Sequence, residues 1–186
     1  MNNTATSVKG TWGIDNTHTE IGFSARHLVV TNVKGKFEKY EVSVEAVNDD
    51  FTDANISFNA DVNSISTGVE QRDGHLKSGD FFNAEEFPKI TFVSSSVKKL
   101  NNDEYTVTGD LTIRDVTKKI ELKADYNGTI VDPWGGTRTG FELNGKISRK
   151  DFNLKWNALT EAGGAVVSDE IKLHINAELT KQAKNN

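Results

Sequence analysis

The chain has 186 residues, a formal net charge of −5 and a pI near 5.4. The acidic balance argues against a nucleic-acid partner, because binding to phosphates requires a basic surface. The absence of cysteine excludes a disulfide framework, and no apolar run approaches the ~18 residues of a membrane span. We expect one domain over residues 10–181, with flexible ends at 1–9 and 182–186.

The opening residues, MNNTATSVKG, contain neither the basic region nor the apolar region of a secretory signal. We therefore expect a cytoplasmic protein. The mature form of an exported protein with a new initiator methionine would have the same appearance.

Alternation of apolar and polar residues, which is typical of strands with one wet face, begins at Trp12. A turn-like break at residues 15–18 separates this first strand from a second one. The next run covers residues 33–47, and Phe37 lies on the opposite parity from Val42, which predicts a β-bulge near Glu38–Lys39. A further strand is expected at residues 56–62.

The segment from residue 64 to residue 92 departs from this alternation. Thr67 and Glu70 have the spacing of a capping box, so a short polar helix should follow them. Ser78–Gly79 is typical of a helix end, and three phenylalanines come after it, namely Phe81, Phe82 and Phe87. We expect this helical segment, at about residues 68–86, to cover one end of the fold as a lid.

The second half of the chain predicts longer strands, at residues 90–100, 105–113, 116–126, 141–147 and 171–179. With about eight antiparallel strands, closure into a barrel removes exposed edges most economically. A β-sandwich would produce the same alternation. Several residues on the predicted inner face are small, which favours a lumen with room for a ligand: Ala25, Ala60, Gly109, Gly145 and Ala177.

Few residues point to catalysis or metal binding. His18 and His27 lack the spacing of a metal motif, and no serine lies in a nucleophile elbow. His27 is predicted either to be a wall residue with a hydrogen-bond partner or to contact a ligand in the lumen. Arg72 and His75 would lie on a solvated helix face or would contact a ligand head group. Arg149 is predicted to form a structural ion pair with Asp151, and we expect neither a metal nor a cofactor.

An ordered set of short motifs resembles the YceI-like, polyisoprenoid-binding family. The motifs run along nearly the whole chain as Asp15-x-x-His18-Thr19-x-Ile21-x-Phe23-x-x-x-His27, Gly35-x-Phe37, Arg72-Asp73-x-His75-Leu76-x-Ser78, Asp80-Phe81-Phe82, Pro88-x-Ile90-x-Phe92 and Arg149-x-Asp151-Phe152. Thr19 replaces the common serine of the family, and Asn153 stands where a glycine often follows, so the turn there could differ.

The resemblance implies an all-β, elongated, eight-stranded, lipocalin-like antiparallel barrel that holds a long isoprenoid or related lipid in its lumen. Such proteins carry or store lipids, often in connection with stress, and no catalysis is established for the family. We expect a non-catalytic lipid-binding protein without a nucleic-acid partner or membrane span. A homodimer is left open by the sequence. The predicted ligand-binding residues are Phe23, His27, Phe58, Arg72, His75, Phe81, Phe82, Phe92, Val107, Leu122, Phe141 and Leu173.

Three alternatives remain open from the sequence. The ligand could be a fatty acid, a fatty amide or a quinone instead of an isoprenoid. The barrel could be an enzyme that uses His27 or His18 as a general base. The third alternative is a barrel that is filled by its own side chains and binds a protein partner instead of a lipid.

Overall fold

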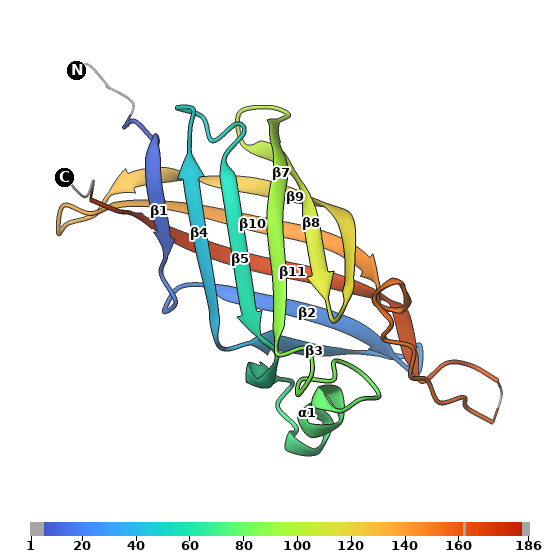
Figure 1. Ribbon diagram of the computed structural model, residues 1–186. Helices are drawn as coiled ribbons and strands as arrows, with labels where there is room; N and C mark the ends of the chain where they lie inside the picture. The colour runs from blue at the N-terminus through green and yellow to red at the C-terminus, as the bar shows by residue number, and fades with distance from the viewer. Residues whose placement is uncertain (1–5, 162, 184–186) are drawn as a thin grey trace.

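The computed structural model describes residues 6–161 and 163–183, so most of the two predicted flexible ends lies outside the described residues. Strands dominate the chain (Figure 1). They are β1 (Gly10–Ile14), β2 (Glu20–His27), β3 (Thr31–Phe37), β4 (Tyr40–Ala46), β5 (Asn55–Asp61), β6 (Ile65–Ser66), β7 (Lys89–Lys99), β8 (Glu104–Ile113), β9 (Val116–Val131), β10 (Thr137–Ser148) and β11 (Val167–Lys181). The helical elements are the 3-10 helices η1 (Val62–Ser64) and η2 (Arg149–Phe152) and the α-helix α1 (Glu70–Lys77).

Eight strands close into an antiparallel barrel in the order β1–β4–β5–β7–β8–β9–β10–β11, and β1 pairs with β11 to complete the ring. The long strand β11 also pairs with β2, so β2, β3 and β6 continue the sheet beyond the ring. The predicted closed barrel with one short helix is therefore confirmed, and the β-sandwich alternative is wrong because all strands belong to one sheet.

The predicted bulge at Glu38–Lys39 is wrong. The chain turns at these two residues and leaves β3 and β4 as separate strands, since β3 pairs with β2 and β6 whereas β4 pairs with β1 and β5. A turn between strands changes the side-chain parity as effectively as a bulge does, which explains the position of Phe37.

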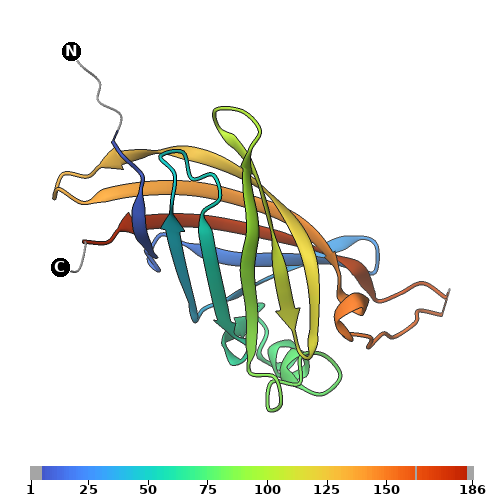
Figure 2. The same cartoon turned by 45° about the horizontal axis from the view of Figure 1, so that its top comes forward.

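The helix α1 and the turns after it lie beneath one end of the barrel (Figures 1 and 2). The helix ends before Ser78 as predicted, but the capping box is wrong, because the N-cap residue is Val69 and no side chain caps it. The positive φ of Gly68 delays the helix start, and the backbone N–H of Thr67 instead donates to Asp73 Oδ1 at 2.8 Å. The α-helix is also shorter than the predicted segment and ends nine residues before its expected limit at residue 86.

The glycines on the inner face do not create empty space, contrary to the expectation from sequence. A Cβ at Gly109 would lie 2.4 Å from Cζ of Phe92 and 2.4 Å from the carbonyl oxygen of Val93, and one at Gly145 would lie 2.4 Å from Cδ2 of Leu122. Each glycine therefore lets a large side chain on a neighbouring strand pack flat against the wall.

Candidate functional site

The barrel encloses a cavity of about 270 Å³ that is lined by side chains from all eight barrel strands and from the lid. All of the lining side chains are apolar except those of Tyr105 and Arg149. The volume is nearly twice that of the roughly 150 Å³ engineered apolar cavity that stays dry and accepts benzene or xenon. An apolar guest is therefore the kind of molecule that this cavity can hold.

The residues that strand parity assigned to the inner face line the cavity: Phe23, Phe58, Phe92, Val107, Leu122, Phe141 and Leu173. Phe81 and Phe82, which lie in no strand, also line it. The strand residues come together because one face of each strand is buried, which fixes the register of every strand in the ring. Their contact with a ligand stays a prediction.

One end of the cavity is covered by the lid, which we define as residues 68–88. Leu76 of α1 and the two phenylalanines after the helix all line the cavity. The ring of Phe82 contacts that of Phe37 with a centroid distance of 6.2 Å, and the ring of Phe81 lies 5.3 Å from that of Trp156. Aromatic contacts therefore attach the lid to the rest of the fold, together with hydrogen bonds such as that from Arg114 Nη1 to the Phe81 carbonyl, at 3.2 Å.

The opposite end of the cavity is closed by an aromatic cluster whose central residue, Phe51, the sequence did not single out. Phe51 follows the turn after β4, has a positive φ of 59° and is buried. Its ring meets that of Phe141 edge-on at 5.2 Å, and Tyr126 lies 5.3 Å from the same Phe141 ring. The feature of the sequence that could have identified Phe51 is a large aromatic residue directly after the polar turn at residues 48–50.

Three predicted ligand contacts lie outside the set of residues that line the cavity: His27, Arg72 and His75. His27 is the last residue of β2 and does not line the cavity, although its register partner Val167 does. Arg72 donates to the hydroxyl and the carbonyl of Thr67, at 2.7 and 2.9 Å, and so supports the lid locally. His75 Nε2 lies 2.8 Å from Asp80 Oδ2, and its ring packs edge-on against Trp156. His27 therefore does not line the lumen. The predicted contact of Arg72 and His75 with a ligand head group stays a prediction.

The two polar residues that line the cavity are both engaged with the backbone. The hydroxyl of Tyr105 donates to the Asp50 carbonyl at 2.8 Å, and burial, followed by the nearby Asp50 charge, raises the pKa of Tyr105. Arg149 donates to the carbonyls of Leu154, Trp156 and Ser168 at 2.6, 2.7 and 2.9 Å. Its ionic partner is Asp169, at 3.5 Å, so the predicted pair with Asp151 is wrong. Neither side chain therefore has a free hydrogen-bond donor to offer a ligand.

The turn after η2 shows why asparagine is tolerated at position 153. Asn153 caps this helix in the left-handed conformation, with φ of 61°. Glycine and asparagine are the residues that adopt this conformation most readily. The departure from the family pattern therefore preserves the turn.

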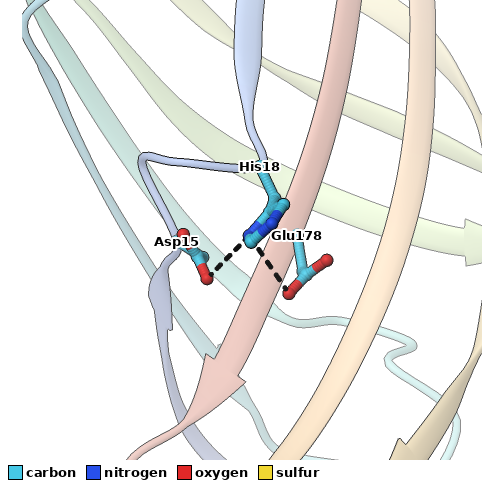
Figure 3. A group of neighbouring side chains, drawn as sticks. All are labelled: Asp15, His18 and Glu178. Carbon is cyan, nitrogen blue, oxygen red and sulfur yellow. Dashed lines mark hydrogen bonds and ion pairs between the residues drawn. The ribbon is translucent and has the colours of Figure 1, made fainter.

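A group of three potential metal ligands lies on the barrel surface, where Asp15, His18 and Glu178 converge (Figure 3). His18 Nδ1 lies 3.2 Å from Asp15 Oδ2 and 3.9 Å from Glu178 Oε1. Arg138 already supplies a cation here, since its Nη1 contacts Asp15 Oδ2 at 2.8 Å and also Glu178, and its Nε contacts Asp132 Oδ2 at 2.7 Å. A metal ion would have to compete with this guanidinium for the same oxygens.

Asp15 gives the fold a specific sensitivity to acid. The Thr17 hydroxyl and the Arg138 guanidinium hold the pKa of Asp15 well below its usual range. Because an unfolded aspartate titrates near pH ~3.9, the stabilisation is complete above about pH 5 and is lost as the pH falls below about 4.

We expect Asp15→Asn to lower the thermal midpoint at about pH 7 and to flatten its fall between about pH 5 and pH 3. Circular dichroism melts across this range would measure both effects. Asp115 is exposed and forms no ion pair within the described part of the chain, so Asp115→Asn is the matched control and should follow the wild type. If the thermal midpoints of wild type and Asp15→Asn fell in parallel as the pH was lowered, Asp15 would not be the cause of the sensitivity to acid.

The closed barrel and its apolar interior define a member of the lipocalin-like class of antiparallel barrels. The model of the YceI-like domain matches residues 12–179. The chain belongs to the YceI-like family, as its motifs predicted. Within residues 6–161 and 163–183, no helix is long and apolar enough to cross a membrane.

Relatives and solved structures agree with this assignment. The UPF0312 protein SAS2572 of Staphylococcus aureus (strain MSSA476) is 37% identical over 167 residues, which cover 89% of this chain and 95% of that protein. The YCEI protein of Campylobacter jejuni is 33% identical with a TM-score of 0.73, covering 91% of this chain and 97% of its own. A polyisoprenoid binding domain from Saccharophagus degradans shares the fold, with a TM-score of 0.68, 15% identity and coverage of 92% and 98%.

Proposed function

We propose that this protein binds the apolar chain of an isoprenoid or a related long-chain lipid inside the barrel, in order to store or carry it without chemical change. The observation that carries the proposal is the continuous apolar lumen between the lid and the Phe51 cluster. Burial of lipid surface there contributes about 25 cal/mol per Å², less the cost of ordering a flexible chain. The polyisoprenoid binding by the domain from Saccharophagus degradans supports the same ligand class.

The polarity of the lumen restricts which part of the lipid enters it. Tyr105 and Arg149, the two polar residues of the wall, donate to backbone carbonyls. A buried head group would therefore lose its hydrogen bonds to water without gaining new ones, which is costly. The head group of the bound lipid thus stays at the mouth, and the lumen recognises only the apolar chain.

Non-catalytic binding is favoured over an enzyme by the position of the histidines. The side chain of His18 is 64% exposed on the outer surface, beside Asp15. His27 lies outside the cavity wall. A general base must reach the proton that it abstracts, and neither imidazole borders the lumen where an apolar substrate would lie.

The proposal is tested by filling the lumen. Ala177 of β11 lines the cavity and is the register partner of Phe141 on the adjacent strand β10. Asn176 is exposed on the outer face of β11. We expect Ala177→Phe to lower the affinity for a long-chain prenyl probe about tenfold or more, which corresponds to ~1.4 kcal/mol or more. Asn176→Phe, which adds the same ring outside, should bind as the wild type does.

Organic extraction and mass spectrometry of the purified proteins give the second measurement. A long-chain lipid should be recovered in near-stoichiometric amount from wild type and Asn176→Phe and should be depleted from Ala177→Phe, with folding checked by circular dichroism. Recovery of the same amount from Ala177→Phe would contradict binding in the lumen. A fatty acid, amide or quinone in the extract would replace the isoprenoid as ligand.

A further inference from the structure

The turn between β2 and β3 exposes three consecutive apolar residues, which we call the apolar tip: Leu28, Val29 and Val30. Val29 is 69% exposed and Val30 is 83% exposed. The backbone N–H of Val30 donates to the His27 carbonyl at 3.2 Å, and φ is 50° at Leu28 and 65° at Val29. Two successive residues with positive φ under such a hydrogen bond are the features of a type I′ turn, here within a three-residue connection because His27 pairs with Thr31.

This turn normally uses asparagine and glycine, because both central residues must adopt positive φ. A β-branched residue such as Val29 is an outlier in that conformation. The chain therefore maintains large apolar side chains at a position where both backbone geometry and solvent exposure oppose them. Such a combination indicates a contact surface instead of a structural requirement.

A neighbouring loop extends the exposed apolar surface of the apolar tip. The backbone N–H of Leu28 donates to the Val166 carbonyl at 3.0 Å. The adjoining loop carries Leu159, which pairs with Ala165 and is exposed. Both elements lie at the right-hand edge of Figure 1, to one side of the lid. This side of the molecule thus presents two apolar loops to its surroundings.

The hairpin that bears the apolar tip is basic, although the whole chain has a net charge of −5. Between Glu20 and Glu38, which flank the hairpin at its base, it contains Arg26, Lys34 and Lys36 and no acidic residue. All three cations are exposed, and none forms an ion pair with another described residue. They share the outer face of the hairpin, because Ser24 pairs with Lys34 and Gly22 with Lys36.

Acidic residues nearby do not cancel these charges. Asp169 and Glu170 on the adjacent strand β11 are paired with Lys150 and Lys146, at 2.8 and 3.3 Å. Glu161 is the single acidic residue between positions 158 and 166. The surface around the apolar tip therefore has an excess of positive charge, which complements an anionic partner.

The second exposed apolar turn, at the far end of the barrel, lacks this charge. It carries Trp134, which is 86% exposed, together with Ile130. Its cation, Arg138, is already bound to Asp15, Asp132 and Glu178. The β9–β10 turn thus exposes apolar side chains while its cation is already paired, whereas the β2–β3 hairpin combines exposed apolar side chains with cations that are unpaired among the described residues.

We propose that the β2–β3 hairpin docks the barrel on anionic lipid bilayers, by inserting the apolar tip among the lipids and placing its cations at the head groups. The apolar side chains of elements that bind at a membrane surface insert ~5–10 Å into the boundary between the head groups and the acyl chains. Arg26 lies two residues from Leu28, or about 7 Å, and Lys34 four residues from Val30, or about 13 Å. Arg26 then lies within the head-group layer and Lys34 at its outer boundary. This inference goes beyond ligand binding and does not depend on what fills the lumen.

The test is co-sedimentation with vesicles of phosphatidylcholine alone or mixed equally with phosphatidylglycerol. We expect the wild type to prefer the anionic vesicles and to lose this preference when salt rises from ~0.1 to ~1 M, which shortens the Debye length from ~10 to ~3 Å. Arg26→Gln/Lys34→Gln should bind both vesicle types equally weakly. Equal binding of the wild type to both vesicle types would overturn the charge argument.

Leu28→Asn/Val29→Gly provides the decisive variant, because it installs the residues that the turn prefers. Its thermal midpoint should equal or exceed that of the wild type, so a loss of binding cannot be attributed to unfolding. We expect it to bind anionic vesicles about tenfold less tightly or weaker still. Trp134→Ala, at the opposite end, is the matched control and should bind as the wild type does.

Two outcomes would overturn docking by this hairpin. One is unchanged vesicle binding by Leu28→Asn/Val29→Gly. The other is a wild-type dimer in sedimentation equilibrium that this variant converts to a monomer, since the apolar tip would then serve a second copy of the chain.

Discussion

Replacing Arg149 by methionine should lower the free energy of unfolding by about 3–5 kcal/mol, because three backbone carbonyls lose the donor that satisfies them. Arg149 is 2% exposed. Its guanidinium connects the segment after η2, through the carbonyls of Leu154 and Trp156, to the start of β11, through that of Ser168. Methionine fills a similar volume but leaves these carbonyls without donors, at a cost of about 1–3 kcal/mol each before relaxation.

Urea unfolding followed by circular dichroism would measure this loss. Lys150 is the matched control, because it is the next residue and its Nζ contacts the same Asp169 at 2.8 Å, but its side chain is 47% exposed. Exposed pairs contribute about 0–1 kcal/mol, so Lys150→Met should have a small effect. If the two variants lost equal stability, charge neutralisation of Asp169 and not the network of carbonyls would be the important role of Arg149.

The loss should extend to the lid. Trp156, whose carbonyl accepts from Arg149, packs against Phe81 at 5.3 Å and His75 at 4.9 Å. Weakening the segment after η2 therefore removes the platform on which the lid residues lie. Arg149 borders the lumen without serving a ligand, and its effect on binding is expected to be indirect.

The cavity wall could be predicted from the sequence because it depends on local periodicity. Phe92 and Leu122 each belong to a strand with one buried face, and a shift of one residue would expose the whole apolar set to water. The periodicity of each strand therefore carries the information about which side chains face inward. Closure of these strands into one ring followed from the number of strands and the cost of free edges.

His27 shows where the same reasoning fails. It shares the parity of Phe23, but it is the last residue of β2, beside the strained turn, and it does not line the cavity although its register partner Val167 does. Parity gives the face of the sheet on which a side chain lies and not its position along the barrel axis. That position depends on where the strands of the ring begin and end, which requires the register of distant pairs.

The polar contacts were also beyond a sequence argument. Arg149 was expected to pair with Asp151, two residues away, yet its carbonyl partners are as distant as Ser168. Thr67 was expected to meet Glu70, but the positive φ of Gly68 shifts the helix start and brings Asp73 into reach. Single backbone dihedrals decide such contacts, and a sequence pattern does not specify them. Phe51, with its own positive φ, was missed for the same reason.

Trp12→Ala is the second substitution with a large expected effect, because Trp12 lies where the ring closes. The residue is fully buried, and the register places it opposite Val44 of β4 on one side and Lys181 of β11 on the other. Its indole Nε1 donates to the Val8 carbonyl at 2.8 Å, and its ring lies 5.7 Å from that of Phe51. Truncation should lower the free energy of unfolding by about 3–5 kcal/mol through lost burial and a residual cavity.

Denaturant unfolding would measure this loss, with Trp134→Ala as the matched control for the loss of a tryptophan side chain. Trp134 is exposed in a loop, so its truncation should change the free energy of unfolding by about 0.5 kcal/mol or less. Hydrogen exchange would add a spatial readout. The amides of β1 and its partner residues in β4 and β11 should exchange faster in Trp12→Ala, because β1 is a strand of five residues that depends on this side chain to stay between its two neighbours. A stability loss below about 1 kcal/mol with unchanged exchange would mean that backbone pairing alone closes the barrel, and that Trp12 only seals its end.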